Sequence, residues 1–189
     1  MKKIAIFASG SGTNAQNIAE YFQTSENIRV SLILSNKPDA YVLERAKNLD
    51  IPFLVFTRKD FYDSSSILEI LQDYHIDFIV LAGFLWFVPE NILRAYPRKI
   101  INIHPALLPN HGGKGMYGDR VHQAVIRSGD KKTGITIHFV NDHYDEGEVI
   151  FQDSFDVLPD DTAESIARKV HTLEYKHFPR VIGEVINNC

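Results

Sequence analysis

The chain has 189 residues, 44% hydrophobic and 23% charged, which is the size and composition of one ordinary globular domain. Twenty Lys and Arg against 24 Asp and Glu give a net charge of −4, which disfavours a dedicated nucleic-acid or membrane-surface protein. The only cysteine is Cys189, so the composition predicts a cytoplasmic protein without disulfides.

Short apolar runs alternate with amphipathic stretches over the first hundred residues. The apolar runs predict strands at 3–8, 30–34, 53–56, 78–81 and 100–103. The first run is shorter than the ~7–15 apolar residues of a signal peptide, and no segment reaches the ~18 of a membrane span. Helices are predicted between the strands, at 14–21, 41–48, 64–74 and 89–95. This βαβα alternation predicts an α/β fold with a doubly wound, mostly parallel sheet.

The last third of the chain has a different pattern. It predicts a helix at 121–127 and strands at 135–140 and 149–155, with the polar loop 141–148 between the strands. A closing helix is expected to start near Asp161, which has capping-box spacing to Glu164. Pro179 is expected to break or kink this helix and leave 181–186 as a short last piece. Since no repeat or linker interrupts the chain, residues 1–189 are predicted to form a single domain.

The glycine-rich segment 9–14, SGSGTN, follows the first strand and opens the first helix. Small residues let the backbone approach a ligand, and the free N–H groups of a helix amino end favour a phosphate. The alternative is a tight turn without a ligand. A dinucleotide site would need an acidic residue about 20 positions on, at the end of the second strand. That strand ends in Leu34, Ser35 and Asn36, so the pattern favours a monophosphate or sugar phosphate.

The strand ending at residue 103 is the most informative part of the sequence. It delivers Asn102 and His104 to one side of its carboxyl end, where open α/β sheets place their sites. Pro105 keeps His104 extended and ends the strand. An amide N–H beside an imidazolium can donate to a developing oxyanion, which suits attack on a carbonyl. The alternative is a histidine with only a structural role.

A carboxylate for this site can come from the loop 141–148, whose acidic residues are Asp142, Asp145, Glu146 and Glu148. One alternative is a solvated acidic loop. Another is a metal site with His138 and His143, but their spacing matches no zinc or calcium pattern. The sequence therefore predicts no metal.

These segments together resemble the phosphoribosylglycinamide formyltransferases, folate-dependent enzymes of purine synthesis, over nearly the whole chain. The matching motifs are ASGSGTN at 8–14, SNKPDAYVLERA at 35–46, VLAGFLWFVP at 80–89, NIHPALLP at 102–109, GITIHFVNDHYDEGEVI at 134–150, and Glu174. The segments at 102–109 and 134–150 are shared by the wider group of formyl-folate enzymes, whereas SGSGTN points to the glycinamide ribonucleotide branch. The resemblance implies a Rossmann-like catalytic domain that transfers the formyl group of 10-formyltetrahydrofolate to the amine of glycinamide ribonucleotide.

The resemblance also implies a role for each matching residue. Asn102 would hydrogen-bond the formyl oxygen, His104 would protonate it, and Asp145 would raise the pKa of His104. The nucleotide would be held by Gly12, Thr13, Asn14 and Glu174, with His171 as a weaker candidate. The folate would contact Leu85, Trp86, Phe87, Val88 and Asn102.

Two positions depart from the pattern of these enzymes. Trp86 and Ser64 stand where a basic residue is common, which affects the expected contacts to the benzoyl-glutamate tail of the folate. The stretch 111–118 is unusually rich in glycine. It is either a lid whose Lys114 reaches a phosphate or a flexible loop.

Three other functions remain as alternatives. A formyltetrahydrofolate hydrolase would use the same residues with water as acceptor, but usually carries an extra amino-terminal domain. A methionyl-tRNA formyltransferase needs a basic carboxyl-terminal module. A non-catalytic sugar-phosphate-binding module would leave Asn102, His104 and Asp145 unexplained. The expected partners are small molecules, without nucleic acid or membrane, and the sequence does not determine the oligomeric state.

Overall fold

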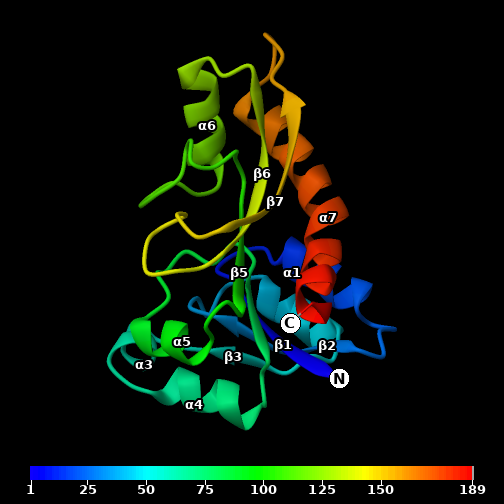
Figure 1. The fold of residues 1–189 in the computed structure, drawn as a ribbon, viewed down its shortest axis with the longest axis vertical. Coiled ribbons are helices and arrows are strands. Elements are labelled where there is room, and N and C mark those ends of the chain that lie inside the picture. The colour runs from blue at the N-terminus through cyan, green and yellow to red at the C-terminus, as the bar shows by residue number, and fades with distance from the viewer. Residues whose placement is uncertain (189) are drawn as a thin grey trace.

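The computed structural model describes residues 1–188 and contains one seven-stranded sheet of order β3-β2-β1-β4-β5-β6-β7 (Figure 1). The strands are β1 (Lys2–Phe7), β2 (Ile28–Ser35), β3 (Phe53–Val55), β4 (Phe78–Leu81), β5 (Ile100–His104), β6 (Lys132–Phe139) and β7 (Val149–Asp156). β1 to β5 pair in parallel, whereas β6 and β7 join antiparallel. The predicted α/β fold with a mostly parallel sheet is confirmed. Cys189 lies outside the described residues.

Helices cover both faces of the sheet. They are α1 (Thr13–Tyr21), α2 (Val42–Asn48), α3 (Arg58–Tyr62), α4 (Ser66–Asp73), α5 (Glu90–Ala95), α6 (Asp119–Ser128) and α7 (Ala163–Asn187). On β1, Ile4 and Ile6 pack in the core with α1, α2 and α7, while Ala5 and Phe7 pack with α3, α4 and α5. Consecutive β1 residues are apolar because both faces of the strand are buried. Within residues 1–188, no helix is both long and apolar enough to cross a bilayer.

Two helix starts differ from the sequence prediction. The predicted helix 64–74 corresponds to α4, but the sequence reasoning missed the short α3 before it, which starts at a capping box of Thr57 and Asp60. At α7 the capping box is Thr162 with Ser165, so the predicted pair of Asp161 and Glu164 is wrong by one position. Thr162 has the extended backbone of an N-cap residue, which lets its hydroxyl accept from the Ser165 N–H.

The prediction that Pro179 breaks the last helix is also wrong. α7 runs without interruption through the buried Pro179. A proline has no N–H for the carbonyl four residues before it, here that of Tyr175. The side chain of Asn17 on α1 supplies the missing donor, with its Nδ2 3.0 Å from the Tyr175 oxygen. The lost helical bond is thus replaced by a tertiary one.

The sheet topology determines where a site can form. After β1 the chain builds outwards through β2 and β3, then returns to add β4 on the other side of β1. Connections on opposite sides of a parallel sheet leave a crevice at the carboxyl ends of the strands between them. The glycine-rich turn after β1 and the segments after β4 and β5 meet in this crevice.

Candidate active site

A cleft of about 650 Å³ lies at the carboxyl edge of β1, β4 and β5. Its walls come from the glycine-rich turn, residues 82–85, residues 102–105, the loop 113–118 and one face each of α6 and α7. The cleft brings together the predicted residues Gly12, Thr13, Asn14, Leu85, Asn102, His104, Asp145, His171 and Glu174. Residues far apart in the sequence thus line one cavity.

The glycine-rich turn presents the amino end of α1 to this cleft. Gly12 is the N-cap residue with a φ of 73°, and a Cβ there would lie 2.4 Å from Cγ2 of Val42. Only glycine fits this position. The first helical bond runs from the Gln16 N–H to the Gly12 carbonyl, and no side chain in the described part caps this helix end. The N–H groups of residues 13–15 are therefore free to bind an anion.

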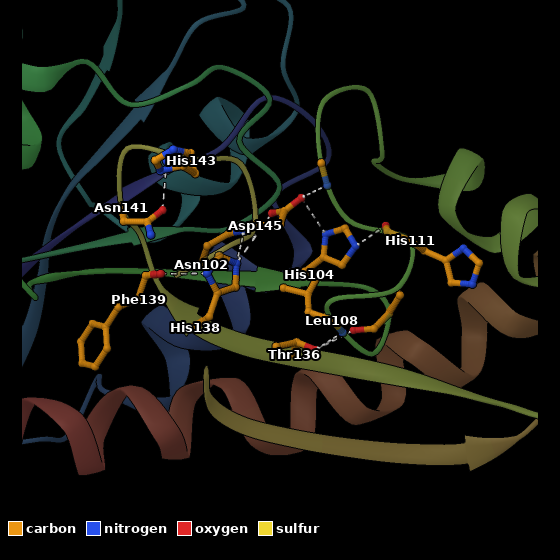
Figure 2. A network of polar contacts seen from close by, with 12 residues as sticks. Asn102, His104, Leu108, His111, Thr136, His138, Phe139, Asn141, His143 and Asp145 are labelled. Atoms are coloured by element: carbon orange, nitrogen blue, oxygen red, sulfur yellow. Dashed lines mark hydrogen bonds and ion pairs between the residues drawn. The ribbon is translucent and has the colours of Figure 1, made fainter. Parts of the chain in front are cut away.

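Asn102 is oriented by a histidine on the neighbouring strand. The β5–β6 register places His138 directly opposite Asn102, and the two side chains meet with Nδ2 3.1 Å from Nε2 (Figure 2). His138 Nδ1 lies 2.8 Å from the Phe139 carbonyl, which can only accept. Nδ1 therefore carries the proton of the neutral ring, and Nε2 accepts from Asn102. This leaves the second N–H of the Asn102 amide for a ligand in the cleft.

The ring of His104 is buried, with one nitrogen hydrogen-bonded and the other facing a carboxylate. Its Nε2 donates to the His111 carbonyl at 2.8 Å, and its Nδ1 lies 3.6 Å from Oδ2 of Asp145. The same carboxylate oxygen accepts from the Gly113 N–H at 2.9 Å (Figure 2). The loop at 111–113 therefore contacts both His104 and Asp145, which the sequence reasoning missed.

The ionisation of this pair differs from the sequence prediction. Burial lowers the pKa of His104 below its ordinary value, and the nearby Asp145 charge opposes this shift without overcoming it. Asp145 therefore raises the His104 pKa as the sequence predicted, but burial, which the sequence did not show, outweighs this contribution. Burial by itself would raise the pKa of Asp145, but its contacts with His138 (Nε2 to Oδ1, 3.7 Å), His104 and the Gly113 N–H hold it below its ordinary value. At neutral pH the site contains a neutral imidazole beside a carboxylate.

A contact between the partly exposed side chains of His111 and Asp130 anchors the loop that touches His104. His111 has a φ of 55°, which is uncommon for a residue with a side chain. Its Nε2 lies 2.6 Å from Oδ2 of Asp130, and this contact lowers the pKa of that carboxyl. The side-chain contact holds the strained backbone in place, and the backbone in turn presents its carbonyl to His104.

Gly147 explains how the Asp145 loop can lie so close to the strands. A Cβ on Gly147 would be 1.7 Å from the Phe139 oxygen, so any other residue would push the loop away. This is the physical requirement for a glycine two residues after Asp145.

Glu174 links the two helices that line the other end of the cleft. It is only 5% exposed, and its Oε2 accepts from Asn14 Nδ2 and His171 Nδ1, each at 2.9 Å. The hydrogen bond to Glu174 raises the pKa of His171. The side chain of Asn14 is therefore committed to α7, and only its backbone N–H remains for an anion at the turn.

Of the predicted folate residues 85–88, two line the cleft or its adjoining groove and two pack in or against the hydrophobic core. Leu85 lines the main cleft, and Phe87 lines an adjoining groove where its ring centroid is 4.8 Å from that of Tyr144. Trp86 instead packs against Phe56, Phe61, Tyr62 and Phe84, and Val88 is buried in the core. The Val88 side chain therefore packs in the core and does not line the cleft.

The histidines considered for a metal site, His138 and His143, each have another partner in the structure. His143 pairs with Asp142 on the exposed loop, at 2.9 Å, while His138 is bonded to Asn102. Among residues 1–188, no three His, Cys, Asp or Glu side chains gather in a way that could hold a metal ion.

Comparisons with known proteins agree with this arrangement. The formyl transferase family profile matches residues 2–182. The chloroplastic phosphoribosylglycinamide formyltransferase of Arabidopsis thaliana is 42% identical over 97% of this chain, which spans 65% of that relative. The phosphoribosylglycinamide formyltransferase of Bacillus subtilis is 37% identical, over 98% of this chain and 95% of its own. The crystal structure of the enzyme of that name from Streptococcus pneumoniae superimposes with a TM-score of 0.87 at 37% identity, covering 98% and 99% of the two chains. The chain therefore belongs to the formyl transferase family, and within it to the phosphoribosylglycinamide formyltransferases.

Proposed function

We propose that this chain transfers the formyl group of 10-formyltetrahydrofolate to the amine of glycinamide ribonucleotide, yielding formylglycinamide ribonucleotide and tetrahydrofolate for purine synthesis. The observation that carries the proposal is the convergence of Asn102, His104 and Asp145 in one cleft with the uncapped amino end of α1. Residues 1–189 act as one catalytic domain on small molecules. A cytoplasmic location is part of the proposal, on the ground of the low cysteine content.

The nucleotide occupies the end of the cleft between α1 and α7. Its phosphate binds the backbone N–H groups at Gly12, Thr13 and Asn14, where the positive end of the helix favours an anion. Glu174 is joined to this turn by its hydrogen bond from Asn14, so its carboxylate contacts the sugar or the glycinamide part of the nucleotide. The chain as a whole carries a charge of −4, so local donors rather than the overall field bind this anionic substrate.

The folate occupies the opposite end, where the segment after β4 borders the cleft. Leu85 and Phe87 supply apolar cover on that side. The Leu85 N–H is bonded to the Ser9 hydroxyl at 3.1 Å, which ties this segment to the nucleotide turn. Both substrates are therefore held by segments that are fastened to each other.

The reaction needs a free amine, and His104 is the group that can generate it. A neutral His104 takes a proton from the substrate ammonium at Nδ1, and the imidazolium that forms is stabilised by the Asp145 charge. The amine nitrogen then bonds to the formyl carbon while the carbonyl electron pair moves to oxygen. The free Asn102 N–H and the imidazolium donate to that oxygen.

Collapse of this adduct completes the transfer. The bond between the formyl carbon and the folate nitrogen breaks, a proton reaches that nitrogen, and the attacking nitrogen loses one. The proton first taken from the ammonium is released to solvent. Asn102 and His104 contribute most while the oxygen carries charge, which is where hydrogen bonds accelerate a reaction.

An assay with and without the acceptor tests this proposal. Purified protein is given 10-formyltetrahydrofolate, and tetrahydrofolate is measured with and without glycinamide ribonucleotide. Product only with the acceptor supports the transferase, and equal product in both reactions indicates a hydrolase. No product in either would overturn the proposed activity. The acceptor without its phosphate is expected to bind at least roughly 100-fold more weakly, and equal binding would contradict the anion site at α1.

A further inference from the structure

Two polar atoms at the nucleotide end of the cleft are buried without a hydrogen-bond partner in the described chain. They are Oδ1 of Asn14 and Nδ1 of His122. Leaving a buried polar atom unsatisfied is costly, so such atoms in a cavity mark a place where a ligand completes the bonding. Asn14 is oriented unambiguously, because its Nδ2 must face the acceptor Glu174 and its Oδ1 must point away.

His122 has no part in the fold or the reaction described above. It lies on α6, which packs against α7 (Figure 1), and its side chain lines the cleft although the residue is only 4% exposed. Burial lowers its pKa, and the titratable groups that act on it from the surrounding elements are Asp119, His171, Glu174 and His104. His122 is therefore a neutral imidazole in the cleft that Glu174 and His104 also line.

The groups around this space determine what chemistry they can bind. Asn14 Oδ1 and the Glu174 carboxylate can only accept hydrogen bonds, and both described contacts of Glu174 use Oε2, which leaves Oε1 available. Two acceptors, one of them anionic, disfavour a phosphate and favour a neutral group rich in donors. A neutral imidazole can donate or accept, so it can pair with a hydroxyl in either sense.

We propose that His122 is a nucleotide-binding residue which, together with Asn14 Oδ1 and Glu174, holds the ribose hydroxyls of the acceptor substrate. The inference rests on the proposed function, since it assumes that a ribonucleotide is the ligand. The phosphate is held at the amino end of α1 and the amine reacts at His104, so the sugar lies between them. Three helices, α1, α6 and α7, then contribute one polar group each to the same diol.

A double-mutant-type cycle, in which both His122 and the ribose hydroxyls are varied, tests the contact between them. Dissociation constants are measured by calorimetry for glycinamide ribonucleotide and for analogues without the 2′- or the 3′-hydroxyl. The proteins are the wild type, His122→Leu and His122→Asn. Gln123→Ala serves as the control, because Gln123 is the next residue on α6 and is exposed. We expect His122→Leu to weaken binding of the ribonucleotide about tenfold and to leave the affinity for one of the two deoxy analogues at the wild-type value.

The conservative variant distinguishes a hydrogen bond from packing. An Asn side chain places a polar atom close to where Nδ1 of His122 lies, so His122→Asn is expected to recover most of the lost affinity. Equal loss for the ribonucleotide and both analogues in His122→Leu, or no loss at all, would overturn the inference while the wild type still binds the nucleotide. A wild type that does not bind the ribonucleotide would contradict the proposed function itself. Thermal unfolding of each variant verifies that it is folded.

Discussion

The Asn102 side chain is aimed by His138, whose Nε2 accepts from the amide nitrogen at 3.1 Å across the β5–β6 pair. Because His138 Nδ1 is bonded to the Phe139 carbonyl, the ring cannot turn without losing two hydrogen bonds. The direction of the remaining Asn102 N–H is thus set by a residue on the next strand. His138 is a positioning residue in this arrangement.

Replacing His138 tests this relationship. His138→Leu removes the acceptor and leaves the Asn102 amide free to rotate, so we expect kcat to fall roughly tenfold, corresponding to ~1.4 kcal/mol in the barrier. The affinity for the nucleotide should stay the same, because the phosphate turn and Glu174 are untouched. Steady-state kinetics with a separate binding measurement separates the two effects. An unchanged kcat would mean that Asn102 needs no support from His138.

The lowered pKa of His104 predicts a pH dependence with a definite sign. As pH falls through the pKa of His104, the ring is protonated before the substrate arrives and cannot take its proton, so kcat/KM falls on the acid side. In Asp145→Asn the charge that raises this pKa is lost, so the acid limb moves to lower pH. The same variant should lower kcat by roughly 100-fold or more, because the imidazolium loses its counter-charge.

NMR titration of the histidine ring protons measures this shift directly. His104→Ala identifies the His104 signal and is itself expected to lose at least roughly 100-fold in kcat while remaining folded. A His104 pKa that rises in Asp145→Asn, or near-normal turnover in either variant, would contradict the assigned roles.

The His111–Asp130 pair is expected to control His104 through the backbone. Asp130→Asn weakens the contact that holds His111 at positive φ, so the carbonyl no longer fixes the proton on Nε2 of His104. We predict a several-fold lower kcat, of the order of 1 kcal/mol, and mixed ring tautomers in the nitrogen NMR spectrum of His104. Lys131→Gln, at the adjacent position, is the control. A single tautomer in Asp130→Asn would show that His111 needs no anchor.

Asp161 predicts where acid begins to destabilise the fold. Hydrogen bonds from Lys169, Ser165 and the Leu158 N–H lower the pKa of Asp161 to about 2. Because the folded pKa lies below the unfolded one, this stabilisation is complete above about pH 4 and is lost as pH falls towards 2. Asp161→Asn is therefore expected to lower Tm at pH 7 by a few degrees, and the difference from the wild type should shrink as pH falls towards 2 and vanish below it. The neighbouring Asp160→Asn is the control, and a difference that grows in acid would contradict the prediction.

Most of the fold could be predicted from the sequence because buried strands are apolar on successive positions. Periodicity located the seven strands and the main helices, and Asn102 and His104 followed from their place at a strand end. Periodicity cannot show that a side chain distant in the sequence replaces a hydrogen bond that a helix has lost. Pro179 signals a break locally, and only the position of Asn17 on a distant helix reverses that signal.

The remaining errors concern groups whose roles depend on pairing and burial. His138 was readable as a partner of Asn102 only with the β5–β6 register, since a shift by one residue would have turned it to the other face. The pKa of His104 depends on how deeply the ring is buried, which no motif states. Neither His111 nor His122 belongs to a motif. The structure reveals His111 by its contact with Asp130, and His122 by a buried nitrogen without a partner among the described residues.

The contact from Asn17 to the Tyr175 carbonyl has a consequence for how the nucleotide is recognised. Asn14, one turn earlier on α1, binds Glu174, the residue before Tyr175 on α7. The two walls of the nucleotide end are therefore fastened at two adjacent points, one of which exists because Pro179 left a carbonyl without its donor. The entropy of bringing the walls together is already lost in folding, so binding does not have to supply it. A residue that weakens its own helix thereby prepares the cleft for its substrate.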